Sequence, residues 1–174
     1  MLIGEKVCLG PVLQPDGPMF FGWMNSLDLV HDNGPYRPTD QASFDRWFGG
    51  IGQDPTRVVF AIRHRRDLRL MGYVQLINIM PAPRTAELGI LIGAPSDRGQ
   101  GYGQEAVRMA VQFGWRDLNL QRISLLVIGE NPGAVRVYLK TGFEVEGVLR
   151  RASYVNGAFR DITIMGLLRL EADA

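Results

Sequence analysis

The alternation of apolar and polar positions predicts one short strand followed by a helical segment at the start of the chain. Residues 6–13, "KVCLGPVL", predict the strand. Residues 16–27 predict a helix with Asp16 as its N-cap. Residues 40–51 predict a second helix, which Thr39 caps and a Gly-Gly pair ends. This segment is therefore expected to be mainly helical.

The pattern then changes to alternating segments rich in β-branched residues. Residues 57–65, 70–79 and 85–93 predict three consecutive strands, joined by short turns as in an antiparallel meander. Residues 103–118 place apolar side chains at helical spacing and predict an amphipathic helix. The continuous apolar run over 121–129 predicts a buried strand.

The last part of the chain predicts one short helix and a hairpin. The helix covers residues 132–141, opened by an Asn-Pro pair and closed by a C′ glycine. Residues 143–155 and 159–169 flank Asn156-Gly157, a strong hairpin signal. The predicted order is β-α-α-β-β-β-α-β-α-β-β, which indicates a mixed α+β fold with a mostly antiparallel sheet, in one domain over residues 1–174.

Composition narrows the classes of partner. The 174 residues include 19 basic and 18 acidic side chains, a net charge of +1, so we expect neither nucleic-acid nor membrane binding. Cys8 is the only cysteine, and His31 and His64 lack ligand spacing, so we expect no metal site. No signal peptide or membrane-length apolar run is found, and we expect a cytoplasmic protein.

The stretch "PSDRGQGYGQEAV", residues 95–107, places glycines at 99, 101 and 103 directly before a helix. A glycine-rich turn at a helix N-terminus predicts an anion cradle, because backbone N–H groups and the helix dipole both favour negative charge. A Walker A loop would need Gly-Lys-Ser/Thr, and a dinucleotide loop would need G-x-G-x-x-G in a parallel βαβ unit. Arg98, Gly101 and Gly103 instead fit [Q/R]-x-x-G-x-[G/A]. The simpler alternative is a tight turn without a ligand.

Two segments resemble the signatures of the GNAT acetyltransferase superfamily. The stretch "ILIGAPSDRGQGYGQEAV" resembles its acetyl-CoA motif, and "ENPGAVRVYLKTGFEVEGVLR" resembles its second signature. The tail "GFEVEGVLRRASYVNGAFRDITIMGLL" is most similar to the RimJ/RimL branch, which acetylates ribosomal-protein N-termini, with polyamine acetyltransferases as near relatives. The resemblance covers about residues 58–168 and fades over the first fifty. It implies a V-splayed sheet with helices on both faces.

The resemblance implies that acetyl-CoA binds between the third predicted strand and the two later helices. The end of that strand would pair with pantetheine, the glycine loop would wrap the pyrophosphate, and Asn131 would contact the cofactor arm. Asn131 also suits a plain N-cap role, and both roles can hold together. The residues that match the cofactor site are Leu91, Ile92, Gly93, Arg98, Gly99, Gln100, Gly101, Tyr102, Gly103, Gln104 and Asn131.

Two residues match catalytic roles of the family. Tyr138 lies seven residues after Asn131, two helical turns on, and would protonate the leaving thiolate; the alternative is a core aromatic. Glu87, on a strand that is otherwise apolar, is the candidate base for the attacking ammonium; the alternative is a solvated strand-edge glutamate. Some relatives carry a catalytic glutamate where this chain has Leu126, which leaves a water chain open as the base.

The sequence says least about the substrate that accepts the acetyl group. Phe20, Trp23, Tyr36 and Trp47 could line its pocket, although aromatics at such spacing are more often core residues. The leading hypothesis is acetyl transfer to a primary amine, such as a protein N-terminus or a small amine, by direct attack in a ternary complex. The alternatives are a polyamine or antibiotic acetyltransferase and a catalytically silent CoA-binding module. A homodimer is typical of the branch.

Overall fold

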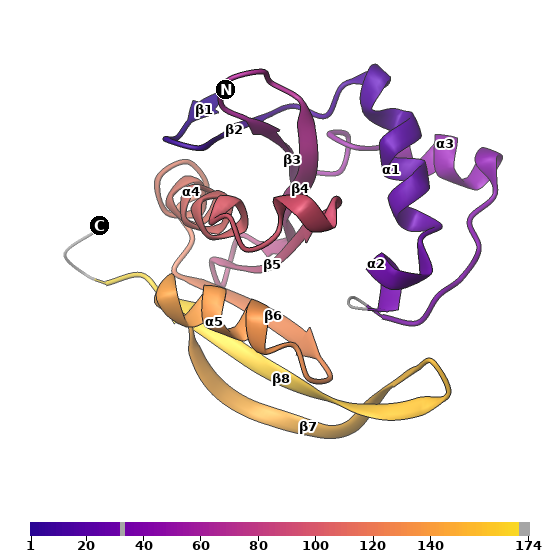
Figure 1. Ribbon diagram of the computed structural model, residues 1–174. Helices are drawn as coiled ribbons and strands as arrows, with labels where there is room; N and C mark the ends of the chain where they lie inside the picture. The colour runs from indigo at the N-terminus through magenta and orange to yellow at the C-terminus, as the bar shows by residue number, and fades with distance from the viewer. Residues whose placement is uncertain (32–33, 171–174) are drawn as a thin grey trace.

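The computed structural model describes residues 1–31 and 34–170 and contains one eight-stranded sheet (Figure 1). The strand order is β1-β2-β3-β4-β5-β6-β8-β7. All neighbours are antiparallel except β5 and β6, which are parallel. The strands are β1 (Leu2–Ile3), β2 (Val7–Gly10), β3 (Val58–His64), β4 (Leu70–Met80), β5 (Thr85–Ile92), β6 (Arg122–Ile128), β7 (Glu144–Val155) and β8 (Ala158–Leu168).

Helices cover both faces of the sheet, so the predicted mixed fold with a mostly antiparallel sheet is confirmed (Figure 1). On one face pack α1 (Gly17–Met24) and α3 (Gln41–Gly49), with the short α2 (Leu27–His31) beside them. On the other pack α4 (Tyr102–Arg116) and α5 (Pro132–Lys140). Within the described part of the chain, no helix combines the length and apolar character needed to cross a membrane.

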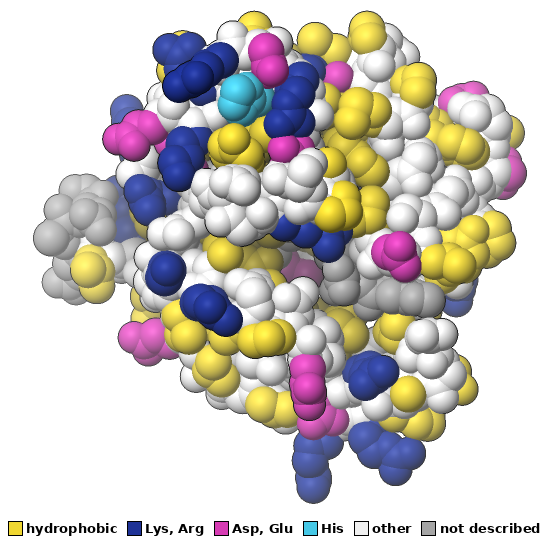
Figure 2. Space-filling model, in the orientation of Figure 1, with side chains coloured by type: hydrophobic (Ala, Val, Ile, Leu, Met, Phe, Trp, Pro, Cys, Tyr) yellow, Lys and Arg dark blue, Asp and Glu magenta, His cyan; other side chains and the backbone are white. Residues whose placement is uncertain are grey.

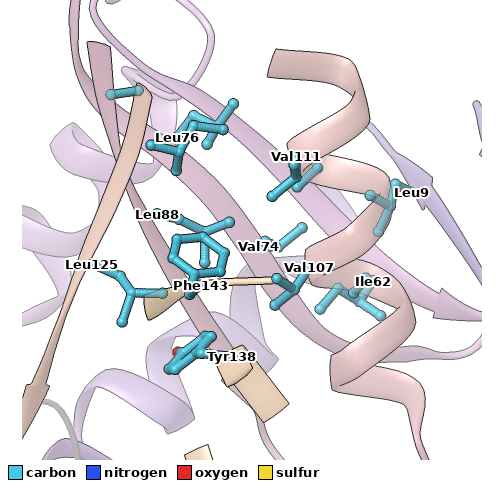
Figure 3. Packing of buried hydrophobic residues seen from close by; sticks show 14 of the residues in the cluster. Leu9, Ile62, Val74, Leu76, Leu88, Val107, Val111, Leu125, Tyr138 and Phe143 are labelled. Atoms are coloured by element: carbon cyan, nitrogen blue, oxygen red, sulfur yellow. The ribbon is translucent and has the colours of Figure 1, made fainter. Parts of the chain in front are cut away.

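Each face has its own apolar core. The larger one joins α4 and α5 to the sheet, and Figure 3 shows Val107 and Val111 of α4 directed toward the strands. The smaller one is aromatic and joins α1 and α3 to β4 and β5. Its ring contacts centre on Phe20, which stacks on Tyr73 at 5.4 Å and meets Phe48 edge-on at 5.6 Å. Burying this many rings fixes both helices against the sheet.

Three local features, two glycine-containing turns and one helix cap, agree with the predictions made from the sequence. Gly142 ends α5 with φ +93°, as a C′ glycine does. Asn156 and Gly157 have φ +48° and +76°, the two positive values that a type I′ hairpin requires. Asn131 caps α5, because its Oδ1 accepts from the Ala134 N–H at 3.0 Å. Each of these depends on neighbouring residues only.

The predicted helix starts at the N-terminal end are wrong in detail. Asp16 does occupy the N-cap position of α1, but its side chain forms no cap bond there: it ends a 3-10 turn, and its buried carboxylate accepts from Arg63 at 2.6 Å. A buried carboxylate is stabilised better by an arginine than by a helix terminus alone. The cap of α3 is Asp40, whose Oδ1 accepts from the Ser43 N–H, whereas the N–H of Thr39 donates to Asn25. The helix predicted over 16–27 is present as α1 but ends at Met24, and neither α2 nor β1 was predicted.

Candidate active site

The sheet splits between β5 and β6. The two strands pair in parallel from Thr85 with Arg122 to Glu87 with Ser124, and no further pair between them occurs in the described residues. Beyond this point β5 continues along β4 as far as Ile92, while β6 continues along β8. One edge of β5 therefore turns away from its neighbour, which is the V-shaped splay that the family resemblance predicts.

A pocket of about 590 Å³ opens at this fork. Figure 2 shows the surface hollowed at the centre of the face, with Lys or Arg atoms along its upper edge. Its walls come from α2, β5, the glycine loop, α4, β6 and α5. The residues matched to the cofactor site that line it are Leu91, Ile92, Arg98, Gly99, Gly101, Gly103, Gln104 and Asn131.

The glycine loop has the backbone that its sequence predicts. Gly99 and Gly101 have φ +75° and +84°, in the left-handed region where a side chain is costly. Gly101 is also the N-cap of the fifteen-residue α4, whose N-terminus therefore meets the pocket. Gly103 is different, because a Cβ there would make only ordinary contacts, 3.7 Å from Ile92. The loop presents backbone N–H groups and a helix dipole, which suit a phosphate.

An ion pair between a buried carboxylate and a half-exposed arginine supports this loop, and it was not predicted from the sequence. The Asp97 carboxylate is 5 % exposed and accepts two hydrogen bonds from Arg69, at 2.6 and 2.7 Å. These bonds hold the pKa of Asp97 below its usual range. Asp97 lines the pocket two residues before Gly99. The pair thus ties the loop to the start of β4, and no local signal could have joined residues 28 positions apart.

Two further contacts shape the loop. The Lys6 ammonium donates to the Gln100 carbonyl at 3.0 Å, and the Arg98 guanidinium donates to the Ile92 carbonyl at 3.3 Å. The strand β2 that follows Lys6 is itself tied to α4, because the Glu105 carboxylate accepts three backbone N–H groups. These donors are Glu5, Lys6 and Val7, at 2.6, 2.8 and 3.1 Å. The anion cradle is therefore fixed from both of its ends.

Tyr138 lines the pocket from α5 and also belongs to the larger core. Its ring meets Phe143 edge-on at 5.9 Å, and Figure 3 shows the two rings next to Leu125. Burial raises the pKa of Tyr138 to about 12. The phenol therefore keeps its proton throughout the physiological pH range. Asn131 lines the same pocket, and because its oxygen caps α5, its amide N–H groups are the donors left for a ligand.

Glu87 stands at the fork but outside the pocket lining. It is in the last β5–β6 pair, half-buried, and its Oε2 accepts from Asn78 Nδ2 at 3.5 Å. Asn78 has φ +52° where the register of β4 shifts, a bulge that aims its side chain at Glu87. Across the fork, Leu126 is 46 % exposed and lines the pocket, so β6 offers no carboxylate there.

Three of the matched cofactor residues do not line the pocket: Gly93, Gln100 and Tyr102. Gly93 lies under Trp23, whose Nε1 would be 2.2 Å from a Cβ at this position, so the glycine is required by packing. The ring of Tyr102 meets His64 edge-on at 5.8 Å.

The aromatic residues suggested for the acceptor pocket have mostly core positions. Phe20 and Trp23 are buried in the aromatic core, and Trp47 packs against it. Tyr36 is half-buried in the loop before α3. Among the described residues of α1, α2 and α3, Leu29 of α2 is the one that lines the pocket. It was not singled out from the sequence. Arg136 and Lys140 of α5 also line it and were missed, although their spacing of four places them on one helix face.

A splayed strand, a left-handed glycine loop at a helix N-terminus and a buried tyrosine beside them are the features that the family resemblance predicts around a CoA thioester. The family comparison agrees: residues 6–144 match the model of the acetyltransferase (GNAT) domain. The chain belongs to this family.

The proteins similar to this chain include several bacterial N-acetyltransferases. The spermidine N(1)-acetyltransferase of Vibrio cholerae is 38 % identical over 100 residues, 58 % of this chain and 57 % of that enzyme. The matched segment thus spans little more than half of that relative's length. The N-acetyltransferase YoaA of Bacillus subtilis is 30 % identical over 95 % of this chain and 94 % of its own. The solved spermidine N-acetyltransferase of Vibrio cholerae with CoA and spermine has a TM-score of 0.87 at 26 % identity, covering 95 % of this chain and 96 % of that one.

Proposed function

We propose that the protein transfers an acetyl group from acetyl-CoA to a primary amine by direct attack in a ternary complex. The observation that carries the proposal is one pocket lined by the free edge of β5, the left-handed glycine loop and Tyr138. An anion cradle alone would suit many nucleotides. A strand edge available for an extended amide chain next to that cradle suits the pantetheine arm of CoA.

Different residues of the pocket would bind different chemical groups of acetyl-CoA. Backbone groups of Leu91 and Ile92, which line the pocket, would pair with pantetheine amides, whereas the Gly93 N–H donates to the Met71 carbonyl at 2.9 Å. The loop from Arg98 to Gln104 would surround the pyrophosphate. Asn131 would donate to the arm. Acetyl-CoA supplies the thioester that the amine attacks. A backbone N–H of the splayed strand would then stabilise the oxyanion formed at the thioester oxygen.

Tyr138 would protonate the leaving thiolate. The support for this role is that the phenol lines the pocket and, with its pKa raised to about 12 by burial, holds a proton at every pH where the enzyme would work. Glu87, or a water chain that ends at it, would take the proton from the incoming ammonium. The support for Glu87 is its position in the last pair before the strands diverge. Its position outside the pocket lining favours transfer through water over direct contact.

A small polyamine is the acceptor that we propose first. The relatives named above include spermidine acetyltransferases, one of them solved with spermine. A protein N-terminus, as in the RimJ/RimL branch, is the second candidate, supported by the similarity of the C-terminal segment. Among the described pocket residues the acidic one is Asp97, which is paired with Arg69. Specific binding of a polycation would therefore rely on Glu87 and on acids beyond this lining.

Assembly into a homodimer is also a proposal. The edge strand β7 leaves Val145, Val148 and Leu149 roughly half exposed, and such an edge is a natural site for pairing between copies. Light scattering on the purified protein tests this, and a monomer mass at micromolar concentration would contradict it.

A thiol-release assay with acetyl-CoA tests the function. Spermidine, spermine, peptides with free N-termini, amino acids and aminoglycosides serve as acceptors, and Tyr138→Phe serves as the matched inactive control. Release that requires an acceptor and falls in the variant supports acetyl transfer, and the acceptor class with the highest kcat/KM identifies the substrate. Acetyl-CoA binding by calorimetry without release across the panel would favour the silent CoA-binding module.

Glu87→Gln separates the two routes for the amine proton. If Glu87 is the base, kcat falls in this variant, whereas a chain of water molecules alone leaves kcat unchanged. Asn78→Ala is the control that disturbs the same bulge without removing the carboxylate.

A further inference from the structure

The α5 wall of the pocket carries two basic side chains, Arg136 and Lys140. They are four residues apart, so they lie on the same face of the helix, and both line the pocket. Both are exposed, and neither forms an ion pair with another described residue. The helix therefore presents two uncompensated positive charges to the cavity.

The two charges repel each other when no anion is bound between them. Like charges four residues apart on a helix repel. Lys140 lies in the last turn, where the helix dipole favours a cation, but Arg136 lies in the middle of α5 and gains little from it. An anion held between the two side chains would remove the repulsion. The pair thus favours an anionic ligand at this wall.

The glycine loop forms a different wall of the same pocket, and its backbone favours an anion as well. There the φ values of Gly99 and Gly101, the N-terminus of α4 and Arg98 provide for one phosphate group or a diphosphate. The acidic residue of the lining, Asp97, is neutralised by Arg69. The pocket therefore offers two separate anion sites, one built from backbone and one from side chains. A ligand that satisfies both must carry two separate anionic groups.

Resting on the proposed function, we propose that Arg136 and Lys140 bind the 3′-phosphate of CoA and make the enzyme select CoA over 3′-dephospho-CoA. A phosphate monoester carries close to two negative charges at neutral pH and accepts several hydrogen bonds. The guanidinium of Arg136 can bind two of its oxygens, and Lys140 supplies a second point charge. The diphosphate of the same ligand stays at the glycine loop.

Calorimetry with CoA and with 3′-dephospho-CoA tests this subsite. The wild-type protein should bind CoA about tenfold more tightly, the value of one or two partly exposed charge-assisted contacts. In Arg136→Ala/Lys140→Ala the preference should fall to within about twofold, because only the contact with the 3′-phosphate is lost. The affinity for 3′-dephospho-CoA should stay at the wild-type value.

The control is Arg108→Ala/Arg116→Ala, which removes two exposed charges of α4 outside the pocket lining. It should keep the full preference for CoA, which separates a local contact from an effect of net charge. Equal binding of both cofactors by the wild-type protein, or a preference that survives in the α5 double variant, overturns the subsite. Failure of the wild-type protein to bind either cofactor overturns the proposed function as well. Each single α5 variant repeats the test if the double variant unfolds.

Discussion

Removing Arg69 should weaken cofactor binding although Arg69 does not line the pocket. In Arg69→Ala the Asp97 carboxylate loses both of its hydrogen bonds, at 2.6 and 2.7 Å, and stays beside the glycine loop without its counter-charge. The negative charge then faces the same cavity as the cofactor phosphates. The variant should therefore lose both loop rigidity and anion affinity.

The size of the expected loss of stability follows from how far the two side chains of the pair are buried. Asp97 is almost fully buried, but the Arg69 side chain is 46 % exposed, so the pair has less value than a fully buried one. Two charge-assisted bonds at this exposure suggest a loss of about 2 kcal/mol in the free energy of unfolding. For a chain of this length that lowers Tm by roughly 4 to 8 °C. An unpaired charge near a phosphate adds a loss of about tenfold in acetyl-CoA affinity.

Thermal unfolding and calorimetry with acetyl-CoA measure the two effects separately. Arg122→Ala is the matched control, because Arg122 makes the same two-pronged pair with Glu146, away from the pocket, with both side chains about one third exposed. It should lower stability slightly and leave the affinity unchanged. In Arg69→Ala/Asp97→Asn the carboxylate is gone, so the affinity should recover relative to Arg69→Ala alone.

The pH dependence supplies an independent check. The bonds from Arg69 lower the pKa of Asp97, so in the folded protein the pair stabilises at pH values above the usual carboxyl range and loses this effect as the pH falls through the lowered pKa. Arg69→Ala should flatten this acid-side loss. An unchanged acetyl-CoA affinity in Arg69→Ala, or the same weakening in Arg122→Ala, would refute the reasoning.

Three shorter predictions concern the same region. Tyr138→Phe should reduce kcat by about 10²-fold or more with little change in acetyl-CoA affinity, and a wild-type kcat in a steady-state assay would remove Tyr138 from the mechanism. Because the pKa of Tyr138 is about 12, no loss of rate below about pH 11 should come from its ionisation. Gly101→Val forces a β-branched residue to φ +84° and should cost about 1–2 kcal/mol in unfolding experiments and abolish acetyl-CoA binding; retained binding in calorimetry would argue against the loop as the phosphate site. Glu105→Gln weakens three backbone N–H contacts of residues 5–7 and should destabilise by about 1–3 kcal/mol, with the loss visible as faster amide exchange in β2; unchanged exchange would show that these contacts do not anchor the strand.

Features set by neighbouring residues could be predicted from the sequence. The positive φ values of Gly99, Gly101 and the Asn156-Gly157 turn follow from the residue types, because few other side chains tolerate them. The cap of α5 by Asn131 has the same origin. Most elements and the family signatures were accessible for the same reason, since their patterns lie within short windows.

The detailed boundaries at the N-terminal end show where local reasoning stops. Asp16 is a residue type that commonly caps helices through its side chain. Its buried carboxylate instead accepts a hydrogen bond from Arg63, 47 residues later in the chain. Thr39 and Asp40 are both acceptable caps, and the contact between Thr39 and Asn25 leaves the role to Asp40. Local propensities rank such residues closely, so a distant partner decides between them.

What the sequence by itself determined is therefore local: the glycine loop before α4, the helix that carries Tyr138, the strand that carries Glu87 and the family to which the chain belongs. Only the tertiary structure decided the position at which β5 and β6 part, directly after Glu87, the ion pair between Arg69 and Asp97 beside the loop, and the presence of Arg136 and Lys140 in the pocket lining. The physical reason is that each of these depends on contacts between segments far apart in the chain. Their geometry is set by the packing of helices on both faces of the sheet, which no short window of residues contains.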